Sequence, residues 1–287
     1  MIMKNITLIL LKVMNNSMFL TLLFIVVGLF SCNGGTAKET DGTESPLDTI
    51  CKSEAIKTIP VDTIPKYAQM IIDAYPEFDI KYSEGNLVFM DGSIIVCDDK
   101  KEKGFVEKLD NCDIEDMFSM SYDTTAVEPA YLNDCGRGRN EELFKKMYGS
   151  TELAARKNLV SVDWFGQKIP FTKINGASVQ LKKVASELQK SPQLRKYLTN
   201  ASSFYWRKVR GANRQSAHSY GIAIDINTSY SNYWLWSNPK RSETDKIRYV
   251  NRIPMEIVKV FEKYGFIWGG RWYHYDTMHF EYRPEFL

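Results

Sequence analysis

The segment from Gly221 to Asn227 (GIAIDIN) constrains the fold of this chain more than any other, because its pattern predicts one short β-strand. Side chains alternate between the two faces of a strand, so the three isoleucines share one face and belong in a hydrophobic core. Asp225 points to the opposite face, where the neighbouring glycine and alanine leave room. A charged residue within an Ile-rich strand needs a polar or charged partner. The strand therefore predicts a polar site backed by a core.

The three histidines of the chain all lie within its last seventy residues. His218 lies in the turn before the strand, close enough to fold back toward Asp225. Residues 272–280 alternate aromatic and polar side chains and end in a turn and His279. Two imidazoles and a carboxylate suit Zn²⁺, and three protein ligands leave a fourth position for water. Each residue alone fits an ordinary loop or core role, but together His218, Asp225 and His279 predict a Zn²⁺ site.

A further carboxylate is needed to take a proton from water activated by the metal. Asp276 precedes His279 by three residues, and Glu281 follows it by two. If a strand runs through residue 280, Glu281 shares a face with His279 and either accepts the proton or orients the imidazole. Asp276 has a simpler interpretation as a turn aspartate. The residues alone leave both carboxylates open as the base.

Two motifs in this region resemble those of a known peptidase family. They are S-x-H-x-x-G-x-A-x-D at residues 216–225, and G-F-x-W-G-G-x-W followed by D-x-x-H-F-E at residues 265–281. This pattern is similar to the zinc D-alanyl-D-alanine carboxypeptidase and L-alanyl-D-glutamate peptidase family, the VanX/VanY-like group that includes phage endolysin peptidases. The resemblance covers roughly residues 175–287. It implies zinc ligation at the positions of His218, Asp225 and His279, and Asp276 as the base.

The resemblance also implies a catalytic arginine on the strand before the histidine motif, which contacts the substrate carbonyl or carboxylate and stabilises the developing oxyanion or anchors a substrate carboxylate. Arg207 matches it best, while Arg210 and Arg214 are nearby rivals with simpler interpretations as solvated loop charges. Ser216 matches the family's serine, which binds substrate or braces the loop. Carboxypeptidases of the VanX type carry glutamate where Asp276 stands, whereas endopeptidase-like members carry aspartate. This difference counts against an activity restricted to the D-Ala-D-Ala bond.

Tryptophans gather in the same part of the chain. Five of the six lie after Ser203, Trp272 among them. They belong either to the core or to the aromatic wall of a substrate cleft, where we place Trp272 as a substrate-binding residue. The Ser/Asn-rich stretch around residues 230–236 is expected to form a rim loop of that cleft.

The N-terminus predicts export. Residues 1–32 combine lysines, an apolar run and a cysteine, which resembles a bacterial lipoprotein signal with lipidation at Cys32; a plain secretory peptide is the alternative. Residues 33–65 are polar and predict a disordered tether. The protein is thus expected to be a membrane-anchored lipoprotein facing the periplasm or cell envelope. A net charge of +2 without a basic stripe argues against nucleic acid as a partner.

The remaining sequence predicts an α+β domain. Hairpins are expected within residues 87–96 and 160–171, and helices around residues 67–75, 177–188 and 254–264, with Ser191 capping a short helix. Residues 66–150 are expected to form an N-terminal subdomain of unknown role, and residues 151–287 the zinc peptidase domain. The resemblance implies the D-Ala-D-Ala peptidase (hedgehog-like) fold, a small antiparallel sheet with flanking helices. Structural disulfides or buried thiols are expected from the cysteines other than Cys32, namely Cys51, Cys97, Cys112 and Cys135.

Three functional hypotheses follow. The first is a zinc peptidase that hydrolyses peptide stems of bacterial peptidoglycan, of the D-alanyl-D-alanine carboxypeptidase or L-alanyl-D-glutamate endopeptidase type. The second is a non-catalytic peptidoglycan-binding lipoprotein that retains the peptidase fold. A non-haem iron oxygenase fits less well, because the usual close H-x-D pair is missing.

Overall fold

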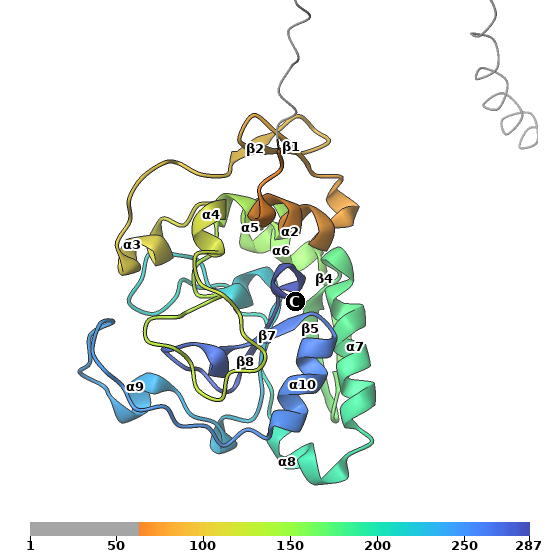
Figure 1. Cartoon of the computed structure of the whole chain (residues 1–287). Coiled ribbons are helices and arrows are strands. Elements are labelled where there is room, and N and C mark those ends of the chain that lie inside the picture. The colour runs from red at the N-terminus through yellow and green to blue at the C-terminus, as the bar shows by residue number, and fades with distance from the viewer. Residues whose placement is uncertain (1–62) are drawn as a thin grey trace, which may run out of the picture. The chain divides into compact units, whose positions relative to one another are not determined.

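A computed structural model describes residues 63–287 of the chain (Figure 1). The predicted lipoprotein signal with Cys32, nearly all of the tether, and Cys51 lie outside the described residues. Among residues 63–287, no helix is both long and apolar enough to cross a membrane.

The described chain contains short strands and mostly short helices, which follow one another in runs. The helices are α2 (Lys66–Ala74), α3 (Phe105–Asp110), α4 (Ile114–Met117), α5 (Glu141–Tyr148), α6 (Glu152–Lys157), α7 (Ala177–Leu188), α8 (Arg195–Leu198), α9 (Trp234–Ser237) and α10 (Met255–Lys263). The strands are β1 (Lys81–Ser83), β2 (Asn86–Val88), β3 (Ile94–Val96), β4 (Leu159–Trp164), β5 (Gln167–Thr172), β6 (Ala223–Asp225), β7 (Phe266–Trp268) and β8 (His279–Tyr282).

All strand pairs in the three small sheets are antiparallel, with orders β1-β2-β3, β4-β5 and β6-β8-β7. The α+β expectation is confirmed, and so are both predicted hairpins, which are β2–β3 and β4–β5. In the third sheet, β8 lies between β6 and β7 and pairs His279 with Asp225. This register decides where the polar site forms.

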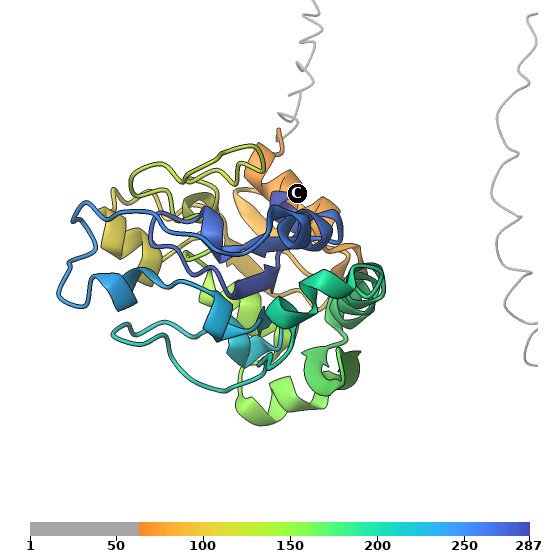
Figure 2. The same cartoon turned by 90° about the horizontal axis from the view of Figure 1, so that it is seen from below.

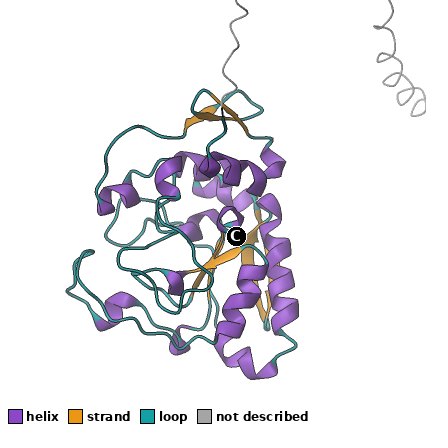
Figure 3. Cartoon of the chain, in the orientation of Figure 1, coloured by secondary structure: helices purple, strands orange, loops and turns teal. Residues whose placement is uncertain are grey.

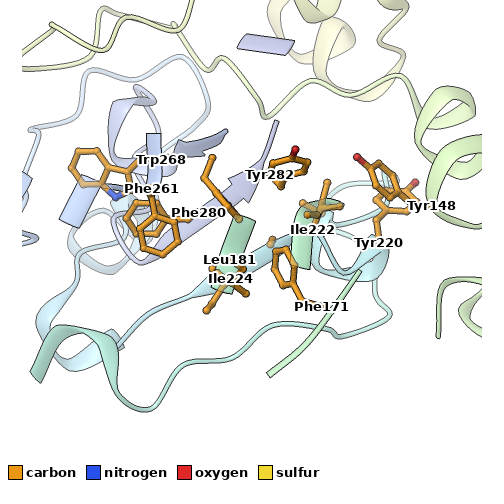
Figure 4. Close-up of a cluster of buried hydrophobic side chains, with 14 of the residues drawn as sticks. Tyr148, Phe171, Leu181, Tyr220, Ile222, Ile224, Phe261, Trp268, Phe280 and Tyr282 are labelled. Carbon is orange, nitrogen blue, oxygen red and sulfur yellow. The ribbon is translucent and has the colours of Figure 1, made fainter. Parts of the chain in front are cut away.

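The hydrophobic core lies behind that sheet (Figure 4). The alternating isoleucines at 222, 224 and 226 are completely buried, as their pattern predicted. Figure 4 shows Ile222 and Ile224 in this core. Phe261 of α10 stacks on Phe280 of β8 with ring centroids 3.9 Å apart. The helices α7 and α10 lie side by side and present their apolar stripes to this core (Figures 1 and 2). Gly265, at a φ of 85°, follows α10 as expected for a left-handed helix end.

The short helix predicted after Ser191 is only partly correct. A 3₁₀ turn over Pro192–Leu194 leads into α8, but the Ser191 side chain makes no capping bond. Its hydroxyl instead donates to Glu256 Oε1 at 3.0 Å, at the start of α10. A tertiary contact therefore replaces the expected local one.

Residues 66–150 share one hydrophobic core with residues 151–287. Phe144 of α5 contacts the Tyr220 ring beside β6, with centroids 5.7 Å apart. The cysteines within residues 66–150, Cys97, Cys112 and Cys135, are buried free thiols, so the described residues contain no disulfide. Of the two expected states, the buried thiol is the one observed for these three.

Opposite α7 and α10, the molecule consists mainly of loops (Figures 2 and 3). They include residues 207–215, the turn at 269–278, and the long connection between α9 and α10. Loops held by a rigid sheet are where binding residues usually lie.

Candidate metal centre

Three predicted ligands meet at one oxygen atom. The β6–β8 register brings His279 Nδ1 to 3.0 Å from Asp225 Oδ1. His218 enters from the 3₁₀ turn Ala217–Tyr220 that precedes β6, and its Nε2 lies 3.2 Å from the same oxygen. The ligand atoms of all three residues lie within 4.8 Å of one another. Asp225 and His279, 54 positions apart in the chain, are thereby brought together beside His218.

The imidazole of His218 has a defined orientation. Its Nδ1–H donates to the Ser203 carbonyl at 2.7 Å, so the lone pair of a neutral ring lies on Nε2 and faces Asp225. Gly221 closes the turn at a φ of 68°, and a Cβ there would lie 2.5 Å from Leu159 Cδ2. The glycine of the first motif thus allows the chain to turn from His218 into β6.

Glu281 contacts the imidazole of His279 at the ring nitrogen that does not face Asp225. That nitrogen, Nε2, lies 3.2 Å from Glu281 Oε2. Burial by itself raises the pKa of Glu281, but Arg139 and the bond from His279 lower it to about 2, so this carboxylate is charged and accepts. The Nε2 atom therefore carries the hydrogen when His279 is neutral, and the Nδ1 lone pair faces Asp225. The structure places Glu281 in the orienting position that the sequence left open.

Three lone pairs converge here, and facing acceptors at such distances need a cation between them. In the metal-free protein a proton on His279 is that cation. Hydrogen bonds to Asp225 and Glu281 outweigh the effect of burial and raise the pKa of His279 to about 10. Burial would also raise the pKa of Asp225, yet His218 and His279 hold it far below its usual value. Two imidazoles and a carboxylate fit Zn²⁺. A bound divalent ion would displace the proton at neutral pH.

Asp276 lines the same pocket as the three ligands. It belongs to the turn between β7 and β8, where its backbone N–H donates to the Gly269 carbonyl at 2.9 Å. Its Oδ1 is buried and has no hydrogen-bond partner among residues 63–287. Burial and the charge of Asp225 raise the pKa of Asp276 to about 7. A carboxylate in this state is suited to proton transfer near neutral pH.

Gly269 of the W-G-G motif packs closely against Asp276. A Cβ on Gly269 would lie 2.5 Å from the Asp276 carbonyl and 3.3 Å from Asp276 Cβ, and backbone cannot move aside cheaply. Gly269→Ala should therefore destabilise the protein by about 1–3 kcal/mol, measured by urea unfolding. Gly104→Ala is the matched control, because a Cβ on Gly104 meets no atom within 4 Å. Equal unfolding midpoints for Gly269→Ala and the wild type would contradict the packing argument.

A pocket of about 550 Å³ opens over the centre and is lined by the three predicted substrate-binding residues Arg207, Ser216 and Trp272. Arg207 is exposed, and its guanidinium bonds only the Lys208 carbonyl, at 3.3 Å, with no ion pair among the described residues. Trp272 is buried with its ring 5.4 Å from that of His279, and its Nε1 lacks a partner within residues 63–287. Both residues line the pocket, and each keeps a hydrogen-bond donor without a partner among the described residues.

The rival arginines differ from Arg207 in their surroundings. Arg214 is buried and forms an ion pair with Asp110, so its charge is already matched. Arg210 is exposed on the loop between residues 207 and 215 and also lines the pocket. The expected aromatic rim is present, since Tyr233, Trp234 and Trp236 line the pocket, whereas Trp268 belongs to the core.

A second group of possible ligands lies deeper in the pocket wall. Asp134, Glu243 and His274 also have ligand atoms within 4.8 Å of one another. Here, however, Arg137 already supplies the cation: its Nη1 lies 2.5 Å from Asp134 Oδ2 and 2.9 Å from Glu243 Oε2. His274 Nδ1 lies 2.5 Å from Asp134, which fixes its ring. We therefore interpret this group as a rigid wall of the pocket.

Sequence reasoning missed the contribution of residues 134–139 to this pocket. Arg137 and Arg139 both line it, although they lie about 80 positions before His218. The only local signal is the R-G-R spacing after Asp134, which places two arginines on one side of an extended chain. Nothing in that stretch indicates which segment it packs against.

The arrangement defines a candidate metal centre with an adjacent buried carboxylate, the equipment of a metallohydrolase. Residues 210–282 match the model of a peptidase family described as D-alanyl-D-alanine carboxypeptidase. This match confirms the resemblance inferred from the motifs. No curated protein and no solved structure gives a significant match to the chain.

Proposed function

We propose that this chain is a zinc-dependent peptidase that cleaves the peptide stems of bacterial peptidoglycan. One observation carries the proposal: lone pairs of His218, Asp225 and His279 converge on one point, beside the buried carboxylate of Asp276 in an open pocket. The match of residues 210–282 to a peptidase family supports the substrate class. We further propose that the domain has the D-Ala-D-Ala peptidase (hedgehog-like) fold.

Each side chain has a role that its surroundings support. Zn²⁺ held by His218, Asp225 and His279 would polarise the scissile carbonyl and acidify a water molecule. Asp276 accepts the proton from that water and returns it to the leaving amine. Arg207, with its charge unmatched, binds the substrate carbonyl or a carboxylate of the stem. Ser216 and Trp272 contact the peptide at the pocket wall.

The shape of the site bears on which bond is cleaved. A second pocket, of about 300 Å³, runs along residues 202–205 and shares Arg207, His218 and Asp225 with the first. Substrate thus has room on two sides of the metal ligands, which an enzyme cutting within a stem requires. Aspartate at position 276 agrees with this, since the endopeptidase-like members of the resembled family carry it. We therefore favour the L-alanyl-D-glutamate endopeptidase type over the D-alanyl-D-alanine carboxypeptidase type.

The test is digestion of purified peptidoglycan and of defined muropeptides, followed by mass spectrometry of the fragments. We expect release of peptides with Zn²⁺ present and none after chelation, with activity restored by added Zn²⁺. Loss of a single terminal D-alanine would identify the carboxypeptidase type instead. Binding to the wall without any released peptide, despite bound zinc, would favour the non-catalytic interpretation.

The pH dependence of the reaction should follow Asp276. A general base works when deprotonated, so kcat/KM should fall as pH drops through the pKa of Asp276. That pKa is raised to about 7 in the metal-free protein, and a bound dication would lower it. We therefore expect an acid limb at or below pH 7 in a profile recorded from pH 5 to 9. A rate that increases toward pH 5 would exclude Asp276 as the base.

The location of the enzyme is a further part of the proposal. We propose that the protein is exported and anchored to a membrane through a lipid on Cys32, facing the periplasm or cell envelope. The apolar run that ends at this cysteine supports it. Metabolic labelling with a fatty acid, compared between wild type and Cys32→Ala, would test the anchor.

A further inference from the structure

Glu281 connects the metal centre to a buried charge network. It lies two residues after His279 on β8, so both side chains share a face of the strand, and it is completely buried. Its Oε2 faces His279 Nε2 at 3.2 Å, while its Oε1 accepts from Arg283 Nη1 at 2.9 Å. A carboxylate held in this way is fixed on the side away from His279.

Arg139 lies on the other side of the same carboxylate. Its Nη1 lies 3.4 Å from Glu281 Oε2 and donates to the Gly136 carbonyl at 2.7 Å. Its Nη2 donates to the Gln215 carbonyl at 3.3 Å, next to the serine of the first motif. Arg139 therefore ties residues 134–140 to both motif segments at once. It lies outside residues 210–282, which match the peptidase family.

The network beyond Glu281 is balanced in charge. Arg283 also pairs with Glu285, whose Oε2 accepts from Tyr75 Oη at 2.7 Å. Two guanidinium groups, of Arg139 and Arg283, thus face two buried carboxylates. Removing one cation leaves a buried negative charge incompletely compensated, which is costly and shifts the side chains that contact it. Glu281 is the carboxylate that transmits such a change to His279.

The backbone of residues 134–140 approaches Glu281 closely at Gly136. Gly136 has a φ of 93°, and a Cβ there would lie 2.4 Å from Ile267 Cδ1 and 3.2 Å from Glu281 Oε1. Its carbonyl accepts from both Arg139 and Arg283. A larger residue at this position would push against the carboxylate that both arginines hold.

We propose that Arg139 is a positioning residue of the metal centre: by holding Glu281, it fixes the His279 ring with Nδ1 toward the metal. This inference rests on the proposed zinc site. It also assigns a role to residues 134–140, which supply the support that the two motifs lack by themselves. Partners that orient a ligand imidazole commonly change metal affinity by about 10- to 100-fold.

The test compares the full chain with Arg139→Gln, Arg139→Lys and Glu281→Gln. Zinc affinity is measured by competition with a chromophoric chelator, and ligand geometry by the absorption spectrum of the Co²⁺-substituted protein. We expect Arg139→Gln to bind zinc about 10- to 100-fold more weakly with an altered Co²⁺ spectrum, and Arg139→Lys to recover part of the affinity. For the double variant Arg139→Gln/Glu281→Gln, the fold-loss of zinc affinity should be smaller than the product of the fold-losses of the two single variants. The reason is that both substitutions act through the same contact.

Arg156→Gln is the matched control. Arg156 forms an exposed ion pair with Glu152 on α6, and its loss should leave zinc affinity unchanged. Thermal unfolding followed by circular dichroism shows which variants are folded. If Arg139→Gln does not fold, Arg139→Lys decides the question with the same two measurements.

The outcomes separate this inference from the proposed function. A folded Arg139 variant with wild-type zinc affinity and Co²⁺ spectrum would overturn the positioning role. A wild type that binds no zinc would overturn it together with its premise. A wild type that binds zinc, depends on Arg139 for affinity and cleaves no muropeptide would support the positioning role while rejecting the peptidase.

Discussion

His218→Ala should abolish zinc binding and lower kcat/KM on defined muropeptides by about 10³-fold or more, because the metal contributes several kcal/mol to the transition state. The variant removes one of three lone pairs and leaves His279 and Asp225 as a bonded pair that a proton can satisfy. The fold should survive, since the side chain borders the pocket and the adjacent strand is held by β8.

Zinc content by atomic emission, muropeptide turnover and thermal unfolding should be measured on the same preparation. Loss of zinc and activity in a folded protein is the expected combination. Full turnover by a folded His218→Ala protein would reject the metal centre described above.

Asp276→Asn should have the second largest effect, of a different kind. The amide has the same shape but cannot take a proton, so kcat should fall by about 10²- to 10⁴-fold while zinc remains bound. Metal content is unaffected because the three ligands meet without Asp276. Its buried Oδ1, unpartnered within the described residues, is the atom whose chemistry is lost.

Asp163→Asn provides the matched control for this substitution. Asp163 lies exposed on β4, where it pairs with Lys168 at the surface. Its turnover and zinc content should equal those of the wild type. If Asp276→Asn retains wild-type kcat, the proton must be taken by another group and Asp276 is not the base.

Much of the fold was predictable because its signals are local. The hairpins expected within residues 87–96 and 160–171 form as β2–β3 and β4–β5, and the helix expected around residues 177–188 forms as α7. Ser191 was misjudged because its hydroxyl finds Glu256, 65 residues away, and no local pattern encodes that choice.

The candidate site was likewise predictable from the sequence only where its signals are local. The motifs named His218, Asp225, His279 and Asp276, and the structure brings all four to one pocket. The sequence left open whether Glu281 is the base or orients His279, because this role depends on which charged residues pack against its carboxylate. That answer comes from Arg139 and Arg283, which belong to no recognisable motif.

The sequence by itself determined which side chains carry the chemistry, since ligand types, glycine positions and strand alternation are written in consecutive residues. Only the tertiary structure decided how those side chains are held. The supporting charges come from residues 134–140 and from the end of the chain, and they reach the centre through a shared core. The physical reason is that a buried carboxylate must be matched by cations from any segment that packs against it, and such packing leaves no spacing rule in the sequence.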